Sequence, residues 1–140
     1  MREIKFRAKS GTQWRHGDLY HNERGELVIY EPKTSGQTLD GVPFDGWRIK
    51  VDPDTVGQFT GLHDADGREI YEGDVLNNSY GRLSVSYKQE WAAFVVCGVD
   101  KTGYYHEYLL DEIVNTPVRR SEIKVIGNVH DNPGLLERKP

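Results

Sequence analysis

The sequence has little sulfur and no long apolar run. Cys97 is the only cysteine among 140 residues, so the chain cannot form an internal disulfide. This excludes a disulfide-stabilised secreted domain and suits the reducing cytosol. No apolar run approaches the ~18 residues of a membrane-spanning helix, and charged residues replace the apolar core of a signal peptide at the start. We therefore expect a cytoplasmic protein without a membrane segment.

The sequence also lacks the usual patterns of catalytic and metal sites. None of its five histidines has a second histidine four residues away, and no Gly-x-Ser-x-Gly motif is present. Cys97 stands in an apolar run without a cysteine or histidine at ligand spacing, so we interpret it as a buried structural thiol. The sequence predicts no catalytic residue, no metal and no cofactor.

Short β-segments separated by turns dominate the chain. Hydrophobic residues make up 36%, glycine occurs 15 times, and apolar residues alternate with polar ones in many segments. The pattern predicts a single domain over 1–140, with possible subregions at 1–57, an N-terminal β-meander, and at 58–140, a barrel-like core. We expect an α+β fold that is mainly β: a short-strand meander with an SH3-like barrel and one short helix. The expected helix covers residues 105–115, ended by Pro117, and residues 31–45 are expected to form a loop. The expected strands cover residues 4–8, 14–20, 27–30, 47–51, 81–88, 91–97 and 123–129.

The densest group of carboxylates lies at residues 64–74. A calcium-binding EF-hand frame with Gly67 at its sixth position would place Leu62 first and Gly73 twelfth, and neither can supply a side-chain oxygen. We therefore interpret the segment as a tight turn at Asp66-Gly67. Glu72 and Asp74 are two residues apart and could form an acid pair like that of glycosidases, but nothing around them builds a sugar site, so a turn is again favoured.

Charge is distributed unevenly. The formal net charge is −4, yet the first 15 residues alone carry +4. A cationic strand beside an aromatic ring can follow a phosphate backbone and stack a base. The same cations can instead protect an edge strand, or meet an acidic patch on a neighbouring subunit. The possible nucleic-acid or partner surface consists of Arg2, Lys5, Arg7, Lys9 and Trp14.

Three motifs resemble a known family. They are Ile4-Lys5-Phe6-Arg7-Ala8 near the start, QFTGLHDADGREIYEGDVL at 58–76 and VIGNVHDNPGLL at 125–136. In this order they resemble the YopX family of small bacteriophage and prophage proteins. The central motif is the specific one, because it fits the family pattern at essentially each fixed position.

The resemblance implies a phage or prophage accessory protein without established enzymatic activity, able to form homo-oligomers. It transfers no catalytic residue, because the family-motif residues look like turn and core formers. These residues are Thr60, Gly61, Leu62, Asp64, Gly67, Ile70, Tyr71, Glu72, Gly73, Asp74, Gly127, Asn128, Asn132 and Pro133.

We therefore expect a non-catalytic binding or self-assembling protein in the cytoplasm of a bacterial host. Two alternatives remain open. One is a nucleic-acid-binding protein that uses the basic N-terminal strand. The other is a phage anti-defence protein that binds a host factor or a nucleotide signal. The expected partners are accordingly further copies of the chain, a host protein or nucleic acid.

Overall fold

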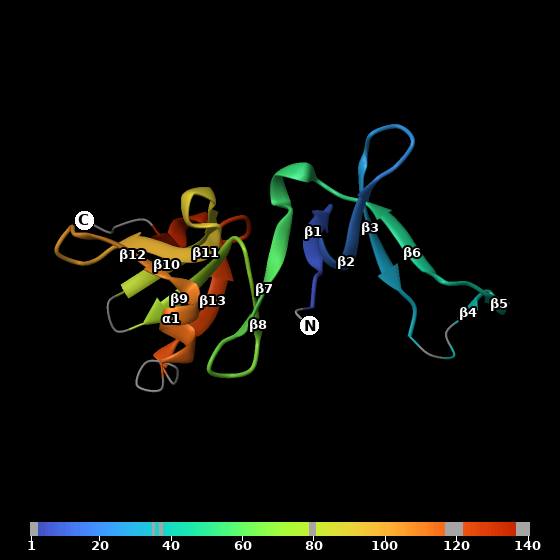
Figure 1. Cartoon of the computed structure of the whole chain (residues 1–140). Helices are drawn as coiled ribbons and strands as arrows, with labels where there is room; N and C mark the ends of the chain where they lie inside the picture. Colours follow the sequence, from blue (N-terminus) through green and yellow to red (C-terminus); the bar gives the residue numbers. More distant parts are fainter. Residues whose placement is uncertain (1–2, 35, 37, 79–80, 117–121, 137–140) are drawn as a thin grey trace. The chain divides into compact units, whose positions relative to one another are not determined.

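The chain forms two compact units, residues 1–58 and residues 59–140. A computed structural model describes all residues except 1–2, 35, 37, 79–80, 117–121 and 137–140 (Figure 1). Both units consist mainly of β-strands, and the described residues contain one short α-helix, α1 (Leu110–Asn115). The prediction of a mainly β fold with one short helix is confirmed. None of the described helices has the length and apolar character needed to cross a membrane.

The first unit is an antiparallel sheet with the strand order β6-β3-β2-β1. The first two residues of β7, Gly57 and Gln58, pair with β1. The expected loop at 31–45 contains a separate two-stranded hairpin, β4–β5. The elements are β1 (Phe6–Ser10), β2 (Gln13–His21), β3 (Leu27–Pro32), β4 (Thr38–Leu39), β5 (Val42–Pro43), β6 (Gly46–Lys50), the 3-10 helix η1 (Pro53–Thr55) and β7 (Gly57–His63).

One face of this sheet forms the small core of the first unit. Ala8, Ile29 and Val51 are buried there, because residues directly opposite each other on neighbouring strands share a face. The strands approach closely at Gly17, where an added Cβ would lie 2.0 Å from the carbonyl oxygen of Tyr30. Only glycine fits this position.

The second unit contains a five-stranded antiparallel sheet with the order β12-β11-β10-β9-β13. Its first and last strands do not pair with each other among the described residues, so the sheet is open and the predicted SH3-like barrel is not found. The remaining part of β7 pairs with β8. The elements are β8 (Glu69–Tyr71), β9 (Asp74–Asn78), β10 (Gly81–Lys88), the 3-10 helix η2 (Gln89–Trp91), β11 (Ala93–Val99), β12 (Tyr105–Leu109), β13 (Lys124–Asn128) and the 3-10 helix η4 (Pro133–Leu136).

The helix expected at residues 105–115 forms only in its second half. Residues 105–109 are strand β12, because the segment pairs residue by residue along β11. The helix begins at the next residue. Pro117, the expected stop, lies outside the described residues.

Helix α1 contributes to the core of the second unit. Its buried side chains Leu110, Ile113 and Val114 pack with strand residues such as Val85 and Val96. In β11, Val95 and Val96 point to opposite faces and both are buried, as the continuous apolar run predicts, whereas Cys97 is only half-buried.

The turn between β7 and β8 is connected to β13 through one buried carboxylate. Asp64 Oδ1 accepts from the backbone amides of Asp66 and Arg68, each at 2.9 Å. Its Oδ2 accepts from the amide of Val125 at 3.0 Å. Gly67 takes the positive φ, +83°, that the turn requires. Asp64 therefore joins two segments that lie far apart in the sequence.

Loss of the Asp64 carboxylate should destabilise the second unit. Asp64→Ala leaves three amides without their charged acceptor, and we expect the free energy of unfolding to fall by about 3 kcal/mol. Urea denaturation followed by circular dichroism measures this change.

Asp66→Ala is the matched control, because it removes an exposed carboxylate from the same turn. Its ion pair with Lys124 is long, at 3.9 Å, and exposed. We expect a loss within about 0.5 kcal/mol. Equal losses for the two variants would contradict the role of Asp64.

Candidate functional site

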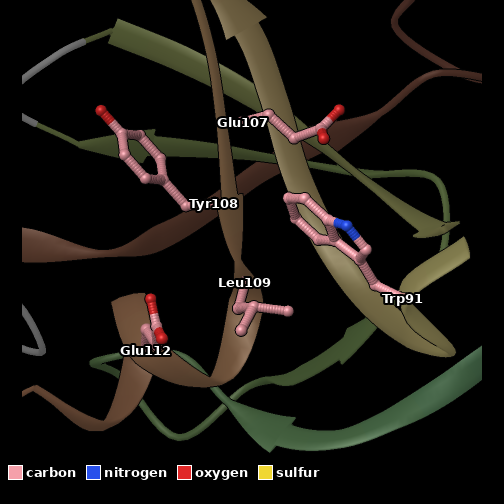
Figure 2. Close-up of a pocket in the computed structure, with 5 residues that line it drawn as sticks. All are labelled: Trp91, Glu107, Tyr108, Leu109 and Glu112. Carbon is pink, nitrogen blue, oxygen red and sulfur yellow. The ribbon is translucent and has the colours of Figure 1, made fainter.

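A pocket of about 450 Å3 lies at the outer edge of β12 in the second unit. Figure 2 shows Trp91 and Glu107 on one side of the strand, Tyr108 and Glu112 on the other, and Leu109 between them. Strand β12, helix η2 and helix α1 supply these five side chains. The pocket combines aromatic and aliphatic walls with two carboxylates.

Four side chains on one side of β12 form a connected network, called here the edge network: Lys88, Trp91, Tyr105 and Glu107. The Lys88 ammonium makes an ion pair with Glu107 Oε1 and lies 4.0 Å from the centroid of the Trp91 ring. The Tyr105 hydroxyl donates to Glu107 Oε2 at 2.7 Å. Glu107 thus positions a cation on an indole ring and a tyrosine beside it.

The contacts of Glu107 favour its ionised form. The hydrogen bond from Lys88 holds the pKa of the Glu107 carboxyl below its usual value, and the bond from Tyr105 adds to this effect. The same bond to Glu107 raises the pKa of the Tyr105 hydroxyl. Glu107 therefore accepts from both partners as a carboxylate.

A second chain of hydrogen bonds orients Tyr108. His106 Nε2 lies 2.6 Å from Asp100 Oδ2, and His106 Nδ1 lies 2.8 Å from the Tyr108 hydroxyl. An ionised carboxylate only accepts, so Nε2 donates to Asp100 and, in the neutral ring, Nδ1 accepts from Tyr108. The bond from His106 strongly lowers the pKa of Asp100, and Thr102 contributes further. This chain fixes one wall of the pocket.

Glu112 supplies the second carboxylate of the pocket. It is exposed on the first turn of α1, and no described hydrogen bond or ion pair engages its carboxylate. The pocket therefore combines one carboxylate that is paired with Lys88 and one on the exposed first turn of α1.

The structure brings together some residues of the nucleic-acid or partner surface that was expected in the first unit. The guanidinium carbon of Arg7 lies 4.6 Å from the centroid of the Trp14 ring, and the Lys9 ammonium lies 5.8 Å from it. Lys5 makes an ion pair with Glu3 at 3.3 Å, while Arg2 lies outside the described residues. Arg7 is buried, so its side chain contributes less to the surface than its charge predicts.

Strand β6 adds two cations that the sequence interpretation omitted. In the register of β6 with β3, Arg48 lies opposite Tyr30 and Lys50 lies opposite Val28. Through β2, these residues share a sheet face with Lys9 and Trp14. We call this the basic face: Arg7, Lys9, Trp14, Tyr30, Arg48 and Lys50.

Anions partly balance the basic face. Arg48 stacks on Tyr30, with 5.2 Å from its guanidinium carbon to the ring centroid, and makes an ion pair with Asp45 at 2.9 Å. Lys50 makes an ion pair with Glu26. These exposed pairs are weak and are screened by salt, so both cations can exchange their partners.

The family-motif residues make contacts inside the second unit. The Asp74 carboxylate is buried and accepts from the Tyr71 amide at 2.8 Å. The Thr60 hydroxyl donates to the carbonyl of Ile70 at 2.7 Å. Gly73 has a φ of +91°, donates to the Val85 carbonyl and accepts from the Val129 amide.

The residues of the closing motif, 125–136, also make contacts with one another. An added Cβ at Gly127 would lie 2.5 Å from Asn132 Oδ1. Asn128 Oδ1 accepts from the amides of His130 and Asp131, and Pro133 begins η4. Among the described residues, no group of three or more His, Cys, Asp or Glu side chains could hold a metal ion.

Sequence reasoning missed the pocket because it assigned β12 to a helix. Residues 105–109 have no regular alternation of apolar and polar side chains, so no local signal identified this segment as a strand. Trp91 was assigned to a strand, whereas it ends helix η2 and is 49% exposed. Its position beside β12 depends on the pairing of β11 and carries no local signal.

Comparison with solved structures finds protein EF1440 from Enterococcus faecalis, whose crystal structure is similar to this chain with a TM-score of 0.50. The two sequences are 21% identical, and the match covers 98% of this chain and 100% of that one. This likeness shows a shared fold. Comparison with curated proteins gives no match.

The family assignment rests on nearly the full length of the sequence. Residues 5–137 match the family described as YopX protein, and this range contains the central and closing motifs in full and the first motif except Ile4. The chain therefore belongs to the YopX protein family.

Proposed function

We propose that this protein is a non-catalytic binding protein and that its recognition surface lies along the edge of β12. One observation carries the proposal: large aromatic side chains are exposed around this strand. Trp91 is 49% exposed and Tyr105 is 62% exposed, although both belong to the edge network. Aromatic side chains that are held in place but remain exposed are typical of binding hot spots.

The geometry of the edge network supports recognition. Glu107 orients both Lys88 and Tyr105, so these long side chains lose little further conformational freedom when a partner binds. The pocket beside them offers a concave surface with apolar walls. Such a preorganised surface favours binding.

The contacts of Asp74 support a non-catalytic role for the acidic motif. Its buried carboxylate already accepts from the Tyr71 amide, so it is poorly placed to exchange protons with a substrate from solution. The phage accessory role implied by the family, and the anti-defence alternative, concern the identity of the partner. Both stay predictions.

Photo-cross-linking tests the recognition surface. We replace Tyr105 with p-benzoylphenylalanine and irradiate bacterial cells that produce the protein. We expect one discrete cross-linked product, because the exposed ring at this position would contact the partner. Mass spectrometry then separates a second copy of the chain from a host protein.

The same replacement at Tyr20 is the matched control, since this tyrosine is 37% exposed and lies in the first unit. We expect no discrete product there. Equal products at both positions, or none at position 105, would contradict the proposed surface.

A second candidate function is binding of single-stranded nucleic acid by the basic face. The observation that favours it is the addition of Arg48 and Lys50 to the face that carries Lys9 and Trp14. Aromatic rings beside cations on a sheet can stack bases while the cations contact phosphates.

For this second candidate, Lys9→Gln should weaken binding of a single-stranded oligonucleotide in a mobility-shift assay. If Lys9 contacts one phosphate, the slope of log affinity against log salt should fall in magnitude by about 0.7. Lys101→Gln is the control, because it removes the same charge from the second unit. No binding at low salt, or equal effects of both changes, would exclude this function.

A further inference from the structure

The outer edge of β12 is unpaired among the described strands. Strand β12 ends the five-stranded sheet, and β11 pairs with only one of its sides. The backbone amide and carbonyl groups on the other side can accept an additional strand, which is a common way of binding an extended peptide. The pocket lies beside this edge.

The pocket already contains one example of cation recognition. The Lys88 ammonium lies over the Trp91 ring and makes an ion pair with Glu107. An aromatic face together with a carboxylate is the combination that binds ammonium and guanidinium groups. Lys88 occupies the Trp91 side of β12, and Tyr108 lies on the other side.

On the opposite side of β12, the same two chemical components, an aromatic ring and a carboxylate, are present. The Tyr108 ring is fixed by His106, and the Glu112 carboxylate has no described partner. Figure 2 shows both side chains on this side of the strand. A long cationic side chain could place its alkyl part against Tyr108 and Leu109 and its charge near Glu112.

The charge of the surrounding segment favours the same ligand. Residues 88–112 contain five carboxylates and two lysines, and one of these lysines is held by Glu107. The carboxylates are Glu90, Asp100, Glu107, Asp111 and Glu112. An acidic peptide would be repelled, and a basic one attracted.

We propose that the edge of β12 binds an extended basic peptide of a partner protein, with a lysine or arginine side chain in the pocket beside Tyr108 and Glu112. This inference rests on the proposed binding function and names the chemistry of the partner. A second copy of the chain is a less suitable occupant, because antiparallel pairing of two β12 strands centred on Glu107 would place two carboxylates opposite each other.

The test uses the full-length protein labelled with nitrogen-15 and a blocked octapeptide of alternating valine and lysine. We expect the peptide to shift the backbone amides of β12 and the indole N–H of Trp91 in two-dimensional NMR spectra. Glu112→Gln should weaken the affinity about tenfold, the loss expected for one charge-assisted hydrogen bond.

Asp111→Asn is the matched control, because it removes a carboxylate from the same turn of α1 without lining the pocket. We expect it to leave the affinity within about twofold of the original, as for other weak surface charge effects. A valine–glutamate octapeptide should cause no shifts. A lysine peptide with N-methyl groups on alternate backbone nitrogens should bind more weakly if strand addition contributes.

Three outcomes would overturn the proposal. They are the absence of shifts at β12, equal effects of Glu112→Gln and Asp111→Asn, and concentration-dependent shifts of β12 without peptide, which would identify a second copy as the occupant. A discrete cross-link at position 105 without binding of the lysine peptide would contradict the proposal of a basic peptide. It would still support the proposed binding function. Peptide binding at β12 without that cross-link would support the basic-peptide proposal and contradict the prediction that a cellular partner contacts position 105.

Discussion

The second unit depends on one buried carboxylate that connects its beginning with its end. Asp64 accepts from two amides of its own turn and from the amide of Val125 in β13. Strand β13 pairs with β9 at one end of the sheet, and the bond from Asp64 gives β13 a second attachment, to the turn between β7 and β8. A second bond, from the amide of Val129 to the carbonyl of Gly73, supports the other end of the same strand. These two bonds, together with the pairing of β9 and β13, explain why two distant sequence motifs belong to one structural unit.

The local parts of the fold could be predicted from the sequence because they depend on local chemistry. The alternation of Leu83 and Val85 with polar residues predicts a strand with one buried face, and Asp66-Gly67 predicts a tight turn. Residues 105–109 were harder, because Tyr108, Leu109 and Glu112 also fit the period of a helix. The segment forms a strand because it pairs with β11, and this pairing depends on residues outside the segment. The predicted barrel is not found for a similar reason, because no single segment encodes the order of the strands in a sheet.

The candidate sites show the same division. The cationic pattern of β1 predicted Lys9 and Trp14 as neighbours, and the register places them directly opposite each other. Arg48 and Lys50 join this face only because the strands follow the order β6-β3-β2-β1, which composition cannot reveal. The position of Trp91 beside β12 also depends on non-local structure. The chain turns at Ala92, a non-glycine residue with a φ of +48°, and then enters β11. Such a conformation is unusual for alanine and has no clear sequence signal.

The open edge of β12 also governs how the protein behaves in concentrated solution. Edge strands commonly carry an outward lysine that opposes sheet-to-sheet aggregation, but β12 contains no lysine, and the ammonium of Lys88 in β10 is engaged by Glu107 and Trp91. Repulsion between approaching edges therefore depends on the carboxylates of α1, Asp111 and Glu112. The backbone of β12 stays able to form hydrogen bonds with another strand, so salt that screens these two carboxylates lowers the colloidal stability of the protein.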